Sequence, residues 1–182
     1  MKKLSRIVGI CGAPFDRAET EKETLAFVLV RMDGRIEGIS RSKVEVDGTD
    51  STRVIIDEIQ KNYAERCNYM MMSGITFAGL NICNISEIYS STDIPVLSIV
   101  KQNPDTESMK RAIIRHTHEP EIRIAILEKT ATVLLSVREN FNVFANLEGI
   151  QKKDAELLVR KSIIFGNLPE PLRLARMISS IL

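Results

Sequence analysis

The chain has 182 residues, with 25 Lys and Arg against 24 Asp and Glu and a formal net charge of +1. The length fits one domain, and 44% apolar residues are too many for a disordered chain. The near-neutral balance excludes a protein that coats DNA through overall charge, so contact with nucleic acid would need a local patch. Three cysteines lie far apart without metal-type spacing, and no apolar run approaches the roughly 20 residues of a membrane span, so we expect a reduced, cytoplasmic protein.

The first part of the chain predicts antiparallel strands. Short apolar runs indicate strands at 7–11 and 25–30, and a third strand is predicted at 35–46. Asp33 and Gly34 between the last two predict a hairpin with a type I′ turn, which needs positive φ at both central residues. The stretch 16–23 is almost wholly charged or small and predicts a solvated loop.

After position 48 the pattern alternates between helices and buried strands. Strands are predicted at 70–72 and 95–100, and helices at about 51–63, 82–89 and from 104 to 116. In the last of these helices we expect Asn103 as the cap and Pro104 at the first helical position. Between strand and helix lies a glycine-bounded loop at 74–79.

The order of these elements predicts a ribonuclease H-like α/β fold. Its first three strands are antiparallel, and the next two are parallel, with flanking helices and right-handed crossovers. Strands at 133–137 and 143–147 and helices at 152–164 and 169–181 complete the chain. We therefore expect one domain over 1–182, with a core at about 1–118 and a C-terminal elaboration at about 119–182.

Three motifs carry a resemblance to a known family. They are Val-Asp-Gly-Thr-Asp-Ser-Thr at 46–52, Ser-Gly-Ile-Thr-Phe-Ala-Gly-Leu-Asn at 73–81 and Leu-Pro-Glu-Pro-Leu-Arg-Leu-Ala at 168–175. In these the chain resembles a largely archaeal family known as domain of unknown function 99, whose members look like relatives of endonuclease V. The resemblance implies an endonuclease V-like fold, nucleic acid as partner and a divalent metal, Mg²⁺ or Mn²⁺, held by carboxylates at strand ends.

The chain departs from this family where the metal would be held. The first strand of the family usually ends Gly-Ile-Asp-Asp-Gly-Pro-Phe, whereas Cys11 and Gly12 stand in place of the two aspartates. Ser73 stands where the later motif usually has a third aspartate. Asp47 and Asp50 remain as a weak, two-carboxylate metal site, and a metal pair for phosphodiester cleavage is not expected.

Each remaining candidate also has a structural interpretation. Asp50 suits the cap of the helix that begins at Ser51, and Asp47 beside Gly48 suits a tight turn. The resemblance implies that Lys101 contacts a phosphate, and the alternative is an exposed lysine at a strand end.

Four further groups of residues have weaker functional interpretations. Cys11 at a strand end before a turn suggests a nucleophile, but a buried structural cysteine is favoured because no histidine is placed beside it. His116, His118 and Glu119 suggest a metal cluster or a polar helix end, and the loop 74–79 suggests a weak phosphate cradle. A basic face or an ordinary solvated surface accounts for Lys152, Lys153, Arg160, Lys161, Arg173 and Arg176.

The combined interpretation is an endonuclease V-like protein that is not an enzyme and that binds DNA or RNA. The alternatives are a divergent metal-dependent endonuclease that uses Asp47 and Asp50, and a scaffold for protein interactions. We expect Cys11, Asp47, Asp50 and Ser73 to converge at one edge of the sheet, since each lies at or just beyond a predicted strand end. The substrate and the formation of a homo-oligomer stay open.

Overall fold

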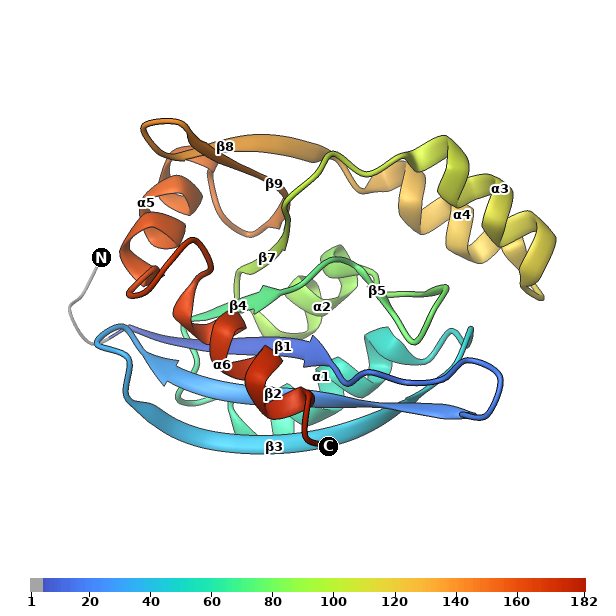
Figure 1. Cartoon of the computed structure of the whole chain (residues 1–182), viewed down its shortest axis with the longest axis horizontal. Coiled ribbons are helices and arrows are strands. Elements are labelled where there is room, and N and C mark those ends of the chain that lie inside the picture. Colours follow the sequence, from blue (N-terminus) through green and yellow to red (C-terminus); the bar gives the residue numbers. More distant parts are fainter. Residues whose placement is uncertain (1–4) are drawn as a thin grey trace.

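A computed structural model describes residues 5–182 and is built on one seven-stranded mixed sheet (Figure 1). The strand order is β3-β2-β1-β4-β7-β9-β8. The bounds of these strands are Arg6–Gly12 for β1, Lys22–Arg31 for β2, Ile36–Glu45 for β3, Tyr69–Met72 for β4, Val96–Val100 for β7, Thr132–Arg138 for β8 and Phe141–Glu148 for β9.

The pairing of β1, β2, β3, β4 and β7 is the one that the sequence predicts. β1 pairs antiparallel with β2, and β2 with β3, whereas β4 runs parallel to both β1 and β7. β9 then pairs antiparallel with β7 and with β8, which joins the C-terminal elaboration to the same sheet. The central strands form because their apolar runs are buried on both faces; Ile7, Met71 and Leu97 contribute to one core while Val8, Met70 and Val96 contribute to the other.

Helices cover both faces of the sheet (Figure 1). Helices α1 (Ser51–Asn62) and α2 (Ile85–Thr92) pack on one face, and α5 (Lys152–Ser162) and α6 (Glu170–Ser179) on the other. α3 (Thr106–His116) and α4 (Pro120–Lys129) lie side by side and project from one end of the sheet (Figure 1). None of the helices within 5–182 is long and apolar enough to cross a membrane.

Several local predictions are wrong. Only Gly34 of the Asp33-Gly34 pair has positive φ, so the predicted hairpin forms but without a type I′ turn. The cap of α3 is Asp105 rather than Asn103, because the Asp105 carboxylate accepts the Ser108 backbone N–H, and Pro104 precedes the helix. Ile82 is not helical, because Asn84 caps α2 and ends the preceding strand segment.

Two elements are not predicted from the sequence. The glycine-bounded loop contains a short hairpin of β5 (Thr76–Phe77) and β6 (Asn81–Ile82), in which two residues pair on each side. Helix α4 has almost no amphipathic pattern in its sequence, and its long-range contacts come instead from a few residues such as the buried Arg123 and Leu127. Both elements lie beyond the carboxyl ends of β1 and β4.

Candidate functional site

Cys11 and Ser73 meet at the carboxyl ends of β1 and β4. The Ser73 hydroxyl lies 3.5 Å from Cys11 Sγ and is placed to donate to it. Cys11 is buried against Val28, Val30 and Ala175 on the face that α6 covers. This packing agrees with a structural cysteine, and the pair presents a thiol and a hydroxyl rather than carboxylates at the two strand ends.

Asp47 lies in the turn between β3 and α1, and its carboxylate is engaged by two groups. Oδ1 accepts the Leu80 backbone N–H at 2.8 Å, and Oδ2 accepts from Arg17 Nε at 2.9 Å. The turn places Asp47 at a φ of 54°, which an L-residue seldom adopts, and Arg123 donates to its backbone carbonyl. Both oxygens of Asp47 therefore hold neighbouring segments in place.

Asp50 occupies the N-cap position of α1, but its side chain makes no capping hydrogen bond. The prediction that the Asp50 side chain caps the helix is therefore wrong. Its oxygens accept the Glu45 backbone N–H at 3.1 Å and the Asn81 side-chain amide at 2.7 Å. The Ser51 N–H at the start of the helix is satisfied by Asn81 Oδ1, from a segment 30 residues further along the chain.

Glu23 is a third carboxylate at this end of the sheet, and the sequence assigns it wrongly to a solvated loop. It lies on β2 and is only 5% exposed, and its carboxylate accepts the Ala78 backbone N–H. It also fills the space above Gly12, where a Cβ would lie 1.7 Å from Glu23 Oε1. Burial raises the pKa of this carboxyl above its usual value, and the Ala78 hydrogen bond partly opposes that shift.

These donor groups do not form a set that fits a hard divalent cation. Side chains alternate along a strand, so Cys11 faces the α6 side while Gly12 and the Glu23 carboxylate above it face the α1 side. Asp47 and Asp50 are linked to segment 78–81 rather than to Cys11 or Ser73. Within residues 5–182 no three His, Cys, Asp or Glu side chains are grouped closely enough to hold a metal ion.

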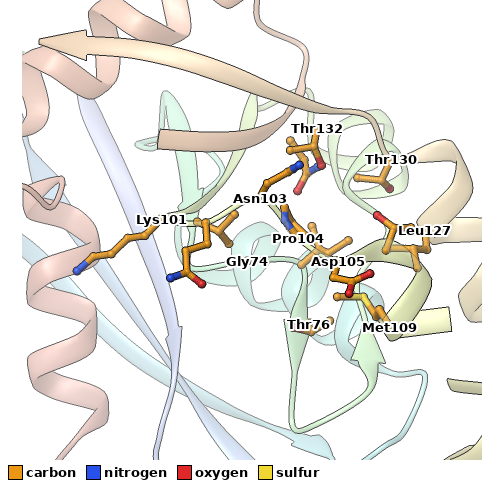
Figure 2. Close-up of a pocket in the computed structure, with 15 residues that line it drawn as sticks. Gly74, Thr76, Lys101, Asn103, Pro104, Asp105, Met109, Leu127, Thr130 and Thr132 are labelled. Atoms are coloured by element: carbon orange, nitrogen blue, oxygen red, sulfur yellow. The ribbon is translucent and has the colours of Figure 1, made fainter. Parts of the chain in front are cut away.

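A cavity of about 570 Å³ lies directly beyond this edge of the sheet (Figure 2). It begins at Gly74, the residue after Ser73, and extends between the loop after β7 and helices α3 and α4. Its volume is in the range of pockets that bind small molecules. The residues that line it are Gly74, Ile75, Thr76, Val100, Lys101, Gln102, Asn103, Pro104, Asp105, Thr106, Met109, Leu127, Thr130, Thr132 and Asn146.

Lys101 stands at the rim of this cavity, as the first residue after β7. Its side chain is exposed and extends away from Leu127 and Thr130 (Figure 2). Across the described part of the chain its ammonium group makes no ion pair or hydrogen bond. Lys101 is thus an exposed positive charge at the rim without a partner among residues 5–182.

The interior of the cavity is mostly uncharged. Ile75, Val100, Met109 and Leu127 supply apolar surface, and the side chains of Thr76, Gln102 and Asn103 have no hydrogen-bond partner within the described residues. The one carboxylate, Asp105, accepts hydrogen bonds from Ser108, which lower its pKa and keep it ionised. The lining therefore combines apolar surface with unpaired hydrogen-bonding groups and one negative charge.

The remaining sequence candidates do not add to the site. His116 ends α3 and His118 follows its C-cap; both are exposed, and neither belongs to a metal-type group in 5–182. In the loop 74–79, the weak phosphate-cradle candidate, the Ala78 amide already bonds to Glu23, and the Leu80 amide just beyond it bonds to Asp47. In the basic face, Arg173 pairs with Glu170 at 2.6 Å and lies over the Phe165 ring, whereas its other members are exposed.

Comparison with known proteins identifies the family. The profile described as Endonuclease dU matches residues 3–182. The chain belongs to the Endonuclease dU family. A UPF0215 protein of Thermoplasma volcanium is 31% identical over 177 residues, which cover 97% of this chain and 89% of the relative. This confirms the family resemblance that the three sequence motifs indicate.

Solved structures extend the comparison to endonuclease V. A protein of unknown function from Archaeoglobus fulgidus superposes with a TM-score of 0.85 at 28% identity, over 97% of each chain. Endonuclease V of Ciona intestinalis, solved in complex with a 24mer DNA containing an inosine, gives a TM-score of 0.61 at 12% identity, over 97% of this chain and 84% of that one. The endonuclease V-like, ribonuclease H-like fold is therefore confirmed.

Proposed function

We propose that this Endonuclease dU family member binds DNA or RNA at the end of its sheet, with a nucleobase in the cavity and a backbone phosphate on Lys101. The observation that carries the proposal is the 570 Å³ cavity, whose uncharged, partly apolar lining opens beside a free lysine. The endonuclease V that the chain resembles in fold was solved in complex with DNA.

The charges favour this division of the nucleotide between cavity and rim. Asp105 inside the cavity would repel a phosphate, whereas Lys101 at the rim would attract one. A base offers a flat apolar face, which can pack against Met109 and Leu127. Its hydrogen-bonding edges can pair with the side chains of Thr76 and Asn103. The overall charge of +1 contributes little, so affinity depends on these local groups.

We also propose that binding does not lead to metal-dependent cleavage. Mg²⁺ and Mn²⁺ prefer several oxygen ligands with at least one or two carboxylates. Cys11 and Ser73 offer none at the ends of β1 and β4, and Asp47 and Asp50 already accept hydrogen bonds from the protein.

The rival function is a divergent divalent-metal-dependent endonuclease, which the description of the family as Endonuclease dU favours. It predicts cleavage of deoxyuridine- or inosine-containing strands with Mg²⁺ or Mn²⁺, and loss of that cleavage on Asp50→Ala. Our proposal predicts product at background level for both metals. Metal-dependent cleavage that the Asp50 variant abolishes would replace binding by catalysis as the function.

Binding is tested with fluorescent single-stranded DNA and RNA oligonucleotides at several salt concentrations. Lys101→Ala should weaken affinity and reduce the salt slope by about one, since one phosphate contact is lost. Met109→Trp, which fills the cavity, should weaken affinity by roughly tenfold, the scale of one base contact. Lys61→Ala removes an exposed lysine of α1 and serves as the matched control. Absence of binding, or equal losses in all three variants, would favour the scaffold alternative.

A further inference from the structure

The carboxylates around the sheet end hold one short hairpin. Ala78 lies between β5 and β6, and its backbone N–H donates to Glu23. Two positions further along, the Leu80 N–H donates to Asp47, and its carbonyl accepts from the buried Arg123 at 3.1 Å. Segment 76–82 is thus fixed from three separate elements, β2, the turn before α1, and α4.

Glu23 has a specific role in this arrangement, because its carboxylate accepts the Ala78 N–H, while the Ala78 carbonyl accepts the Asp47 backbone N–H at 2.8 Å. Ala78 adopts a φ of 43°, a strained conformation for a residue other than glycine, and Glu23 accepts the N–H of this same residue. The carboxylate reaches Ala78 by crossing over Gly12, and a side chain at position 12 would block its path. Gly12 and Glu23 therefore form a matched pair, in which the missing side chain leaves room for the carboxylate.

A buried carboxylate with a single amide donor is a costly way to stabilise a fold. Removing a charged group from water costs free energy that one hydrogen bond offsets only in part. Glu23 is almost fully buried, and the hairpin that it holds supplies Thr76 to the cavity wall immediately after Ile75. The hydrogen bond between Glu23 and Ala78 thus helps to fix the position of the cavity wall at Thr76.

We propose that Glu23 is a positioning residue for the cavity: it holds Ala78, and through it the β5–β6 hairpin, in the conformation that binds the ligand. The residue acts on Thr76 and Ile75 without touching the ligand. This inference rests on the proposed function only where oligonucleotide affinity is measured. The conformation of Ala78 can be followed without a ligand.

The test compares three changes at this pair with a control. Glu23→Leu keeps most of the volume and removes the acceptor, Glu23→Gln keeps an acceptor oxygen, and Gly12→Ala leaves Glu23 intact but displaces its carboxylate. Glu58→Leu is the matched control, because Glu58 is also buried but bonds to Ser40 and Ser42 on β3, away from the cavity. Each variant is assayed for hydrogen exchange at the Ala78 amide and for oligonucleotide affinity.

We expect E23L and G12A to accelerate exchange at the Ala78 amide and to weaken oligonucleotide affinity by about tenfold, the scale of one charge-assisted hydrogen bond. E23Q should retain both properties within about twofold. E58L should lower the melting temperature and change neither. Unchanged exchange and affinity in folded E23L and G12A, or an equal loss in E58L, would overturn the inference. If the wild type binds no oligonucleotide, the proposed function fails, and exchange at Ala78 still decides the role of Glu23.

Discussion

The two ends of the sheet use their charged residues in different ways. Where β1 begins and β2 ends, charges pair with charges on the surface: Arg6 with Glu37 and Arg31 with Asp33. At the other end, carboxylates bond mainly to backbone and side-chain amides, Glu23 to Ala78 and Asp47 to Leu80 among them, although Asp47 also pairs with Arg17. The first end shows ordinary ion pairs, and the second shows acids that fix the backbone around a cavity.

This difference explains why counting acidic residues misjudges the candidate site. Surface ion pairs contribute little to stability and are screened by salt. Buried or partly buried carboxylates that accept amide hydrogen bonds can be removed only at the cost of unsatisfied donors. Carboxylates committed in this way have fewer free oxygens for a metal ion.

Loss of Arg123 should have the largest effect on stability. Its guanidinium is 3% exposed and donates to the backbone carbonyls of Asp47, Gly48 and Leu80. Arg123→Met leaves these carbonyls without a donor, and we expect the free energy of unfolding to fall by about 3 kcal/mol in denaturant titrations. Arg115→Met, at an exposed position of α3, should change it by less than about 0.5 kcal/mol. Equal effects would mean that Arg123 is not an anchor.

Gly12→Ala should destabilise the protein by about 1–2 kcal/mol, because the added methyl group displaces the Glu23 carboxylate. The double variant with Glu23→Ala should recover part of this loss, since the two sites share one space. Gly38→Ala is the control, because a Cβ there would meet no atom closer than 3.4 Å. Strict additivity in this double-mutant cycle would show that Gly12 and Glu23 are not coupled.

The stability contributed by Glu23 should depend on pH in the direction opposite to that of a surface ion pair. Its pKa is raised above 4.5 in the folded protein, so the favourable effect of burying the neutral acid is complete below pH 4.5. That effect is lost as the pH rises through the folded pKa. Glu23→Gln cannot ionise, so its stability relative to wild type should increase as the pH rises from 4.5 through the folded pKa of Glu23. A difference between the two proteins that stays constant with pH would contradict the assigned environment of Glu23.

At the opposite end of the sheet, Asp33→Asn should have the smallest effect. The hydrogen bond from Arg31 lowers the pKa of Asp33 to about 2, so its contribution is present above pH 3.8 and is lost as the pH falls through 2. We expect a small loss in melting temperature near neutral pH, and 1 M salt should reduce it because both groups are accessible to solvent. A loss as large as that of Arg123→Met would remove the contrast between the two ends.

The sequence predicts the sheet well because its central strands are short, continuous apolar runs separated by turn residues. Parallel crossovers follow from the alternation of strand and helix, and Cys11 and Ser73 meet because each ends one of two adjacent parallel strands. Lys101 at the end of β7 follows from the same pattern. Apolar runs, turn residues and the right-handed crossover rule are sufficient to predict this part of the sheet.

What the sequence does not predict depends on contacts between distant residues. Glu23 is buried because Gly12 leaves space for its carboxylate and the Ala78 N–H donates to it. These partners lie 11 and 55 positions away in the sequence. The start of α1 is satisfied by Asn81, so the capping signal of Asp50 is misleading. The sequence of α4 has no strong apolar face, and Arg123 joins it to the rest of the fold through backbone carbonyls. None of these contacts leaves a periodic pattern.

The central claim is that the acids at this end of the sheet hold the backbone and not a metal ion. Thermal melts with and without Mn²⁺ test it in the wild type and in a double variant, Cys11→Asp with Ser73→Asp. We predict that Mn²⁺ leaves the wild-type melting temperature unchanged. The double variant places two carboxylates where the side chains now lie 3.5 Å apart, so it should melt lower without metal and regain stability with Mn²⁺. A wild-type melting temperature that rises with Mn²⁺, and no longer does so after Asp50→Asn, would contradict the claim.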